Sequence, residues 1–332
     1  MGAELVRISI IGFSLGAMVW NVARLTPLGR WPLFELLDIL AVAGYALVPA
    51  LAVAGLLAGR WSTLPWLVLP VACFVVEYGT PLRAAPSTAA PTVRALTSNV
   101  TFDDTDLPGL ETVLNSETPD VVALQELSNE LSARIESSAT LQTAYPHRVL
   151  YPHGATRGLG LLSRYPIRDA SPPDIDDLGC SCFQATIAGP SGPFHVLVAH
   201  PGPPPVTLHT VGRFAVPVGF NTANEMPQLL AVQTRIRAAP HPLLVLGDFN
   251  TSDRQPFYRA LRADLQDTYR ESGPWFGFTF PNASGSAIKL PPLVRIDYLW
   301  HDAAWTAHTA HTGVLPQSDH RYVVADLSLA AG

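Results

Sequence analysis

Short apolar runs recur along the last two thirds of the chain, and they constrain its fold more than any other feature of the sequence. They are VRALTSNV, DVVALQEL, GLGLLSRYPI, FHVLVAHP, PLLVLGDFN, RIDYLWHD and RYVVADLSL, and several are bounded by Gly, Pro or Asp, as strands usually are. We predict helices at residues 108–116, 130–137 and 226–238, the last two because apolar residues recur there at helical spacing beside charged ones. Strands with intervening helices predict a layered α/β domain.

Polar side chains stand at the ends of these runs. They are Asn99, Gln125, Glu126, His200, Asp248 and Asn250, together with Asp297 inside RIDYLW and Ser318, Asp319 and His320 just before the last run. Each residue alone is explained by a turn, a cap or a solvated surface. Because strand ends converge on one rim of a sheet, their joint occurrence predicts a functional site at that rim.

The motifs, in this order, resemble the endonuclease/exonuclease/phosphatase superfamily, which includes DNase I-like nucleases, abasic-site endonucleases, inositol polyphosphate phosphatases and neutral sphingomyelinases. The resemblance runs from Val93 to Leu329 and rests on TSNV, DVVALQEL, GLGLLSRYPI, VLVAHP, LLVLGDFN, RIDYLW and SDHRYVVADL. It implies a four-layered α/β/β/α sandwich of the DNase I-like type, in which two β-sheets pack face to face with helices outside. It also implies a metal-dependent hydrolase that acts on phosphoester or phosphoanhydride bonds.

The resemblance implies a metal site as well. Glu126 would be the principal Mg²⁺ ligand, with Asn99 beside it and Asp319 completing the metal shell; Mn²⁺ is the alternative ion. Carboxylate and amide oxygens are hard donors, which Mg²⁺ prefers, and the ion takes its remaining ligands from water and phosphate.

The remaining motif residues are implied to act on the phosphate. Asp248 would position or deprotonate the attacking water, and Asn250 would steady the transition state. His320, oriented by Asp297, would contact the phosphoryl oxygens or exchange a proton, and His200 would supply a second phosphate contact. His200, Asn250 and His320 are therefore the expected substrate-binding residues, and the choice of general base between Asp248 and His320 stays open.

The segment after His200 departs from the family pattern. Family members commonly continue with an apolar residue, whereas this chain continues with PGPPP. We expect an irregular excursion from here through Asn224, and long loops beside catalytic strands are often where substrate is recognised. The departure leaves the substrate open.

Three apolar stretches precede the α/β region, at residues 8–20, 39–59 and 61–76. The stretch 39–59 is uncharged and long enough to cross a hydrocarbon core of about 30 Å, so it is the strongest candidate for a membrane span. The other two are shorter or interrupted, and each is interpreted as a tilted span or an interfacial segment. A signal peptide is the competing interpretation of the first, but no small-residue cleavage site follows it.

These stretches predict three parts: a membrane region of about three helices at 1–80, a Pro/Ala-rich linker at 81–93 and a catalytic domain at 94–332. The basic residues near the span ends favour a cytoplasmic catalytic domain. They are Arg7 and Arg60 on one side, and Arg24, Arg30, Arg83 and Arg94 on the other. The chain also resembles bacterial family members with several N-terminal spans, including glycopeptide-resistance-associated membrane proteins. That resemblance implies a multi-pass protein of the cell membrane with its catalytic domain outside the cytoplasm, which is the prediction we adopt.

Charge and cysteine content narrow the function classes. After Arg94 the chain has 15 basic and 23 acidic residues, a net charge of −8, and Lys289 is its single lysine. A general nuclease needs a positive surface to neutralise phosphates, so nucleic acid is disfavoured as a partner. The three cysteines do not form a zinc pattern, and the default interpretation of Cys180 and Cys182 is two free thiols, with a disulfide as the less common alternative.

The sequence therefore predicts a membrane-anchored, Mg²⁺-dependent phosphatase or phosphodiesterase. Its expected partners are the lipid bilayer and a lipid-linked or small membrane-proximal phosphate such as a polyprenyl pyrophosphate, because tethering raises the effective concentration of a lipid substrate. The alternatives are a membrane-tethered endo- or exonuclease and a non-catalytic membrane scaffold of the same fold. The scaffold ranks last, because degeneracy usually deletes the metal ligand or the closing histidine and both are present.

Overall fold

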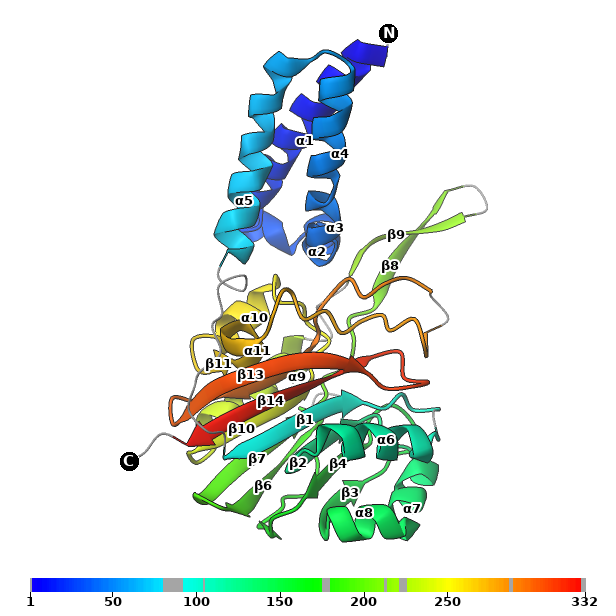
Figure 1. The fold of residues 1–332 in the computed structure, drawn as a ribbon, viewed down its shortest axis with the longest axis vertical. Helices are drawn as coiled ribbons and strands as arrows, with labels where there is room; N and C mark the ends of the chain where they lie inside the picture. Colours follow the sequence, from blue (N-terminus) through cyan, green and yellow to red (C-terminus); the bar gives the residue numbers. More distant parts are fainter. Residues whose placement is uncertain are drawn as a thin grey trace. The chain divides into compact units, whose positions relative to one another are not determined.

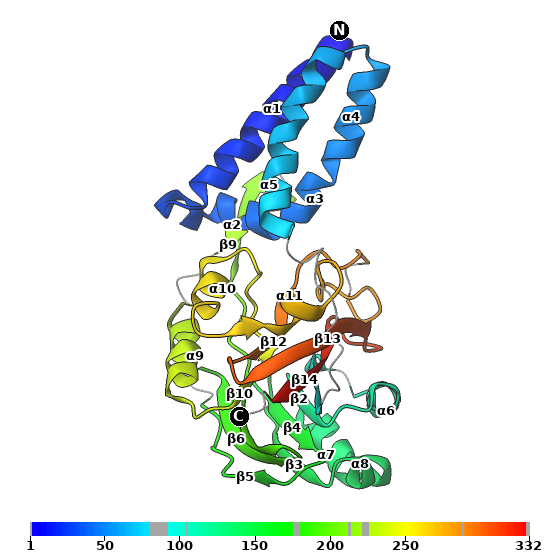
Figure 2. The ribbon, with the colours of Figure 1, turned by 60° about the vertical axis from the view of Figure 1, so that its left-hand side comes forward.

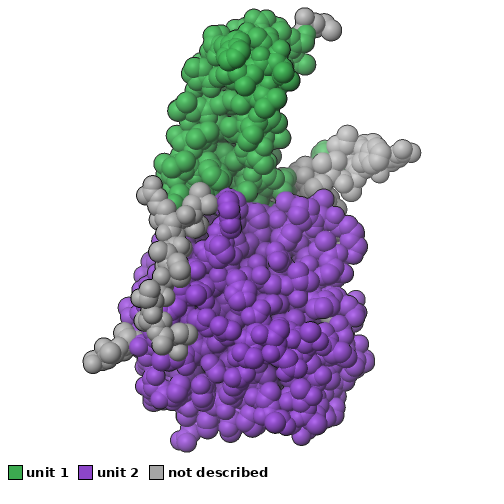
Figure 3. Space-filling view, in the orientation of Figure 1, with its two compact units in different colours: residues 1–83, 205–221 green, residues 84–204, 222–332 purple. Residues whose placement is uncertain are grey.

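The computed structural model describes residues 2–79, 92–103, 105–174, 180–211, 214–220, 226–286 and 289–329. The chain divides into two compact units, coloured separately in Figure 3. The helical unit comprises Met1–Arg83 and Pro205–Asn221, and the sandwich unit comprises Ala84–Pro204 and Thr222–Gly332. Most of the expected linker at 81–93 lies outside the described residues.

The helical unit is built from consecutive helices. They are α1 (Gly2–Ala23), η1 (Pro27–Arg30), α2 (Pro32–Ile39), α3 (Ala41–Tyr45), α4 (Leu47–Leu57), η2 (Trp61–Leu67) and α5 (Val68–Tyr78). Polar side chains join them in the interior: the indole of Trp20 donates to Asp38 over 3.1 Å, and Asn21 donates to the Tyr45 hydroxyl over 2.7 Å. These contacts tie α1 to the helices that follow it.

The stretch 39–59, expected to be the strongest single span, is divided between α3 and α4. The break has a local cause, because Pro49 lacks the N–H that would bond to Tyr45 and its ring crowds that carbonyl. Two other helices are long and apolar enough to cross a membrane, Gly2–Ala23 and Trp61–Tyr78, whereas Ala41–Leu57 is shorter. By length and apolar composition, the first and third stretches thus supply the candidate spans, and the middle stretch supplies a shorter apolar helix.

A hairpin from the second half of the chain belongs to the helical unit. Its strands, β8 (Val206–Val211) and β9 (Phe214–Phe220), pair antiparallel, and β9 lies against α2. The expectation of an irregular excursion was wrong for these residues, which are rich in Val and Thr, the β-branched types that favour strands. The end of that expected excursion, 221–225, lies outside the described residues.

The sandwich unit contains two mixed six-stranded sheets (Figures 1 and 2). The first has the order β13-β14-β1-β2-β4-β3. Its strands are β1 (Val93–Asn99), β2 (Val121–Gln125), β3 (His147–Tyr151), β4 (Leu159–Ser163), β13 (Trp305–Val314) and β14 (Arg321–Leu329). β1 and β2 run parallel with Asn99 opposite Gln125, and the other neighbours are antiparallel.

The second sheet has the order β11-β12-β10-β7-β6-β5. Its strands are β5 (Ile167–Arg168), β6 (Cys182–Gly189), β7 (Gly192–Ala199), β10 (Leu243–Asp248), β11 (Gln266–Asp267) and β12 (Asp297–His301). β7 and β10 run parallel, and β12 runs antiparallel to β10 with Asp297 opposite Asp248. The central strands are buried on both faces, which explains why their sequences are continuously apolar rather than alternating.

Apolar side chains from both sheets form one core between them, and each sheet buries its other face under helices. The helices over the first sheet are α6 (Leu107–Glu117), α7 (Asn129–Ser137) and α8 (Ala139–Ala144), and those over the second include α9 (Met226–Ala238) and α10 (Pro256–Leu261). The short helix α11 (Thr268–Ser272) lies next to β12 and β13. The three expected helices correspond to α6, α7 and α9, with ends within one residue of the prediction.

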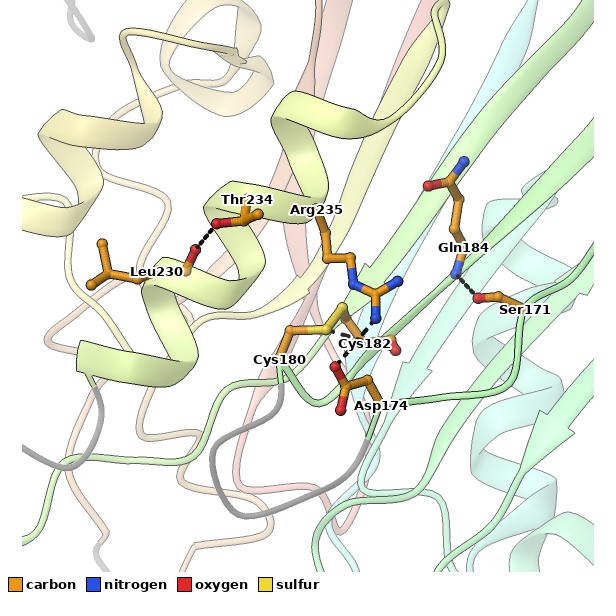
Figure 4. The surroundings of a disulfide bond; sticks show 8 residues. All are labelled: Ser171, Asp174, Cys180, Cys182, Gln184, Leu230, Thr234 and Arg235. Atoms are coloured by element: carbon orange, nitrogen blue, oxygen red, sulfur yellow. Dashed lines mark hydrogen bonds and ion pairs between the residues drawn. A yellow bond between two sulfur atoms is a disulfide. The ribbon is translucent and has the colours of Figure 1, made fainter.

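Cys180 and Cys182 form a disulfide, so the expectation of two free thiols was wrong (Figure 4). Ser181 between them has a left-handed backbone with φ 42°, and this turn accompanies a Cα separation of 5.1 Å, within the range that a disulfide bridges. Both cysteines are buried in the core under α9. Beside them Arg235 pairs with Asp174 over 3.3 Å.

Candidate active site

The strand ends bring the predicted residues to one rim of the sandwich. Asn99 ends β1 and Glu126 follows β2, while Asp248 ends β10 and His200 follows β7. Because each of these strand pairs is parallel, its carboxyl ends lie at the same edge. Asp297 opens the antiparallel β12 opposite Asp248 and so reaches the same place.

Asp248 lies at the centre of the rim and is almost fully buried. Its Oδ2 accepts a hydrogen bond from Asn99 Nδ2 over 3.1 Å, and it lies 3.6 Å from His200 Nε2 and 3.7 Å from His320 Nε2. Its Oδ1 accepts the backbone N–H of Asn250 over 2.8 Å. Burial opposes ionisation, but His320, His200 and the Asn250 amide outweigh it and lower the pKa of Asp248. The group is therefore a carboxylate at neutral pH.

Glu126 is held beside Asp248 by a turned backbone and two hydrogen bonds. Its φ of 59° is left-handed, a conformation that costs of order 1–3 kcal/mol in a residue with a side chain and recurs at functional sites. Oε1 accepts from Asn99 Nδ2 over 3.1 Å, and Oε2 accepts from the backbone N–H of Phe102 over 3.0 Å. One amide, Asn99, thus joins the carboxylates of Glu126 and Asp248.

His320 and Asp297 form a buried pair. His320 Nδ1 lies 2.9 Å from Asp297 Oδ2, the ring packs at 5.0 Å from that of Phe280, and Nε2 faces Asp248. Burial alone would lower the pKa of His320, but the charges of Asp297 and Asp248 outweigh it and raise the pKa to about 10. The imidazole is therefore a cation at neutral pH, with one N–H directed to Asp297 and the other toward the rim.

His200 is the second buried imidazole of the rim. Its Nε2 lies 3.7 Å from Glu126 Oε1 and 3.4 Å from Asn250 Nδ2, which also donates to the Pro201 carbonyl over 2.9 Å. Its backbone N–H donates to the carbonyl of Ser181, the residue enclosed by the disulfide, over 2.8 Å. Burial lowers the pKa of His200, but hydrogen bonding to Asp248 and the two carboxylates raise it overall. The raised pKa values favour the positively charged form of both histidines.

Asp319 joins this network through a threonine. Thr101 Oγ1 donates to Asp319 Oδ1 over 2.6 Å, and the backbone N–H of Thr101 donates to Asn99 Oδ1 over 2.9 Å. The three expected metal ligands, Asn99, Glu126 and Asp319, therefore belong to one set of contacts.

The donor set suits a divalent cation. Among the described residues, Asp248, Asp297 and His320 form a group whose ligand atoms lie within 4.8 Å of one another. Asp297 Oδ1 is buried without a hydrogen-bond partner in the described part of the chain. With Glu126 nearby, carboxylates predominate, and their hard oxygens suit a divalent cation.

Two residues that hold this rim were not identified from sequence. Asn282 Nδ2 donates to the carbonyls of Ser318 over 2.9 Å and His320 over 3.3 Å, and its N–H donates to the Asp319 carbonyl over 2.6 Å. Thr279 Oγ1 accepts the N–H of Asp297 over 3.3 Å. Both lie in a loop whose letters, TFPNASG, follow no strand and match no motif, so no sequence signal distinguished them.

Comparisons with known proteins agree with this geometry. The model of the Endonuclease/Exonuclease/phosphatase family matches residues 96–320, more than half of the chain. A search of curated proteins found no match. Among solved structures, a 3′ phosphatase from Neisseria, NExo, bound to product DNA hairpin is similar with TM-score 0.54 and 17% identity, covering 71% of this chain and 99% of that one.

Two bacterial structures described as endonuclease/exonuclease/phosphatase are similar as well. The one from Beutenbergia cavernae has TM-score 0.51 and 21% identity and covers 72% of each chain. The one from Bacteroides vulgatus has TM-score 0.51 and 18% identity, covering 72% of this chain and 99% of that one. These likenesses establish the DNase I-like fold of the sandwich unit. With the matched family model and the buried acidic and histidine site, they show that the chain belongs to the endonuclease/exonuclease/phosphatase family and is a metal-dependent phosphoester hydrolase.

Proposed function

We propose that this hydrolase is a membrane-anchored, Mg²⁺-dependent phosphatase or phosphodiesterase that acts on a lipid-linked or small membrane-proximal phosphate, such as a polyprenyl pyrophosphate. The observation that carries the proposal is the rim itself, where two buried histidines with raised pKa values lie beside the carboxylates of Asp248 and Glu126. Transfer of a phosphoryl group needs positive charge over its equatorial oxygens and an oriented water.

We assign Mg²⁺ to Glu126, with Asn99 and Asp319, rather than to the group of Asp248, Asp297 and His320 whose ligand atoms lie within 4.8 Å of one another. An ion placed between Asp248 and His320 would have to displace a proton from an imidazole whose pKa is about 10. A bound Mg²⁺ supplies positive charge at the phosphoryl group and polarises its oxygens.

The roles of the protein's other groups follow from their charges. Asp248 is ionised, so it orients the attacking water and accepts its hydrogen bond. The cationic His320 cannot accept a proton at neutral pH and instead donates from Nε2 to a phosphoryl oxygen, while Asp297 fixes its ring. His200 and Asn250 donate to the other oxygens. Of Asp248 and His320, this assignment makes Asp248 the base.

The membrane location is supported by the surface of the helical unit. Large apolar side chains on its helices are exposed: Leu5 by 65%, Val19 by 62%, Leu57 by 86% and Val76 by 84%. A soluble unit of this size would not leave so many uncovered, whereas hydrocarbon would cover them. The first helix also hydrogen-bonds to its neighbour through Trp20, which favours a retained span over a cleaved signal peptide.

The disulfide supports the side of the membrane that we assign to the sandwich unit. Disulfides persist in oxidising compartments and are rare in the cytosol. The bond between Cys180 and Cys182 therefore favours a catalytic domain outside the cytoplasm.

The charge of the sandwich unit favours a small substrate over DNA. A net charge of −8 after Arg94 repels a polyanion, and no counterions are released on binding to an acidic surface. A nuclease remains the second candidate, because the solved structure of NExo contains a DNA product.

The test uses the full chain reconstituted in lipid nanodiscs. A polyprenyl pyrophosphate, a phospholipid and plasmid DNA are supplied separately, in Mg²⁺ and in EDTA. We expect Mg²⁺-dependent turnover of a lipid substrate with little nicking of the plasmid. Rapid DNA cleavage without lipid turnover would replace the proposal with the nuclease alternative.

A further inference from the structure

A second concave site lies in the sandwich unit outside the rim. It is a pocket of about 320 Å³ between the loop 274–278, α11 and the strands β13 and β14. The loop provides Trp275, Phe276 and Phe278, and β14 provides Arg321. Arg321 lies within the motif SDHRYVVADL, but the proposed chemistry uses none of these four side chains.

The pocket has one cation available to a ligand. Two basic side chains line it, and His311 is engaged by Glu117 at 3.1 Å. Arg321 Nε is buried without a hydrogen-bond partner among the described residues. Buried guanidinium N–H groups are normally satisfied, and their planar fork matches carboxylate or phosphate oxygens. A guanidinium that lines the pocket without a carboxylate paired to it among the described residues indicates that the pocket takes an anion.

The walls indicate the rest of the ligand. Phe276 and Phe278 stack with ring centroids 5.2 Å apart and planes at 13°, and Trp275 is 70% exposed on a left-handed backbone with φ 58°. An indole held in solvent on an unfavourable backbone is typical of a surface that a ligand covers. A pocket of about 320 Å³ is near the lower end for ligand sites, so it fits one ring with its anionic group rather than a nucleic acid strand.

The loop is held firmly in place. A side chain at Gly277 or Gly273 would collide with the ring of Tyr269, since an added Cβ would lie 2.3 Å and 2.6 Å from ring atoms. The Tyr269 hydroxyl donates to the Pro274 carbonyl over 2.9 Å. The aromatic wall is therefore pre-formed on α11, which lowers the ordering cost of binding.

The pocket adjoins the catalytic rim through the chain. Arg321, the first residue of β14, directly follows His320 in the chain. Phe278 is likewise two residues from Phe280, whose ring contacts His320. The pocket is therefore next to the catalytic histidine along the chain.

We propose that this pocket binds an oxyanion, a carboxylate or phosphate group, attached to a single flat ring, with Arg321 holding the anion and Trp275, Phe276 and Phe278 holding the ring. The ligand is either a separate molecule or the distal part of a substrate. The proposal does not depend on which substrate the rim hydrolyses.

The test measures binding of phenylphosphonate and methylphosphonate to the full chain in nanodiscs, in EDTA so that metal-dependent binding at the rim is removed. Calorimetry should show phenylphosphonate binding at least tenfold more tightly than methylphosphonate. Arg321→Gln should weaken phenylphosphonate at least tenfold, whereas Arg168→Gln, at an exposed arginine of β5, should not. Equal affinity of wild type and Arg321→Gln would overturn the proposal.

A second variant addresses the ring. Trp275→Ala, at an exposed loop position, should reduce the preference for phenylphosphonate to less than threefold. An unchanged preference would overturn the proposal. A second contrary result concerns the full chain in detergent after anionic vesicles are added. If its tryptophan emission shifts to the blue, and Trp275→Ala shows no such shift, the loop is a membrane anchor and the proposal is overturned.

The two sources of ligand are separated by kinetics in Mg²⁺, with bis(4-nitrophenyl) phosphate as substrate. If phenylphosphonate raises KM, and Arg321→Gln abolishes this inhibition, the natural ligand of the pocket is the distal part of a substrate. A change in kcat alone identifies a separate ligand, and both results support the site. Binding in EDTA needs no turnover, so a failure of the proposed lipid substrate leaves this test unaffected.

Discussion

The protonation of His320 depends on Asp297, and removing that charge gives a quantitative prediction. Asp297→Asn keeps the size of the side chain and replaces a carboxylate 2.9 Å from His320 Nδ1 by a neutral amide. Two unit charges at that distance interact by roughly 6 kcal/mol at an effective dielectric constant of about 20, equivalent to roughly 4 pKa units and an upper limit for the effect. Asp248, at 3.7 Å, remains. We expect the pKa of His320 to fall from about 10 by at least about 2 units.

The assay is an NMR titration of isotopically labelled histidine in EDTA, with the His320 signal assigned by its absence from His320→Gln. Asp169→Asn is the matched control, because Asp169 lies outside the rim. A pKa within about 0.5 units of wild type in Asp297→Asn would refute the electrostatic reasoning.

The same shift predicts how stability depends on pH. The folded-state pKa of His320 lies above the unfolded value of about 6.5, so protonation contributes its full stabilisation below pH 6.5. That contribution is lost as the pH rises from about 6.5 through about 10. Urea unfolding in EDTA should therefore show wild type losing more stability between pH 6 and pH 9 than Asp297→Asn loses. Equal losses would contradict the assignment.

Three further predictions concern the framework of the rim. Asn282→Ala should lower kcat about tenfold with a smaller change in KM, and it should cost about 1–3 kcal/mol of stability, because buried carbonyls lose their donor. Steady-state kinetics and urea unfolding measure the two effects, and an unchanged kcat would contradict the prediction. Gly247→Ala should destabilise the fold by more than about 2 kcal/mol, since its Cβ would lie 1.8 Å from the Ala199 carbonyl oxygen; a urea midpoint equal to that of wild type would refute this. Replacing Cys180 and Cys182 by Ser should lower the free energy of unfolding by at most about 2 kcal/mol, because the loop that the disulfide closes is short. In the wild type, a thiol reagent should label neither of these cysteines, and labelling of both would contradict the disulfide.

The sandwich unit could be predicted largely from sequence because its strands are continuously apolar and end in polar residues. Asn99 and Asp248 each end a buried strand, so local pattern and motif order place them on one rim. Their hydrogen bond could not be predicted from spacing, since it joins residues 149 positions apart. Thr101 and Asp319 are separated by 218 positions, and only the folded sheet brings them together.

The errors have physical causes that local patterns do not contain. Hydropathy alone favoured a single span over 39–59, whereas the structure has a turn at Ala46 between α3 and α4. Two cysteines at i and i+2 are usually free, and the left-handed Ser181 that accompanies their pairing is not visible in composition. Asn282 acts through backbone carbonyls, which no side-chain motif records.

The most direct test of the account is the response of Glu126→Gln to Mg²⁺, measured as phosphate release from a polyprenyl pyrophosphate by the full chain in nanodiscs. Glu130→Gln, at an exposed position of α7, is the matched control. We predict that Glu126→Gln loses at least about 100-fold in rate and needs more Mg²⁺ for half-maximal activity, while Glu130→Gln matches wild type. Wild-type rates and Mg²⁺ dependence in Glu126→Gln would contradict the assignment of the metal to this carboxylate.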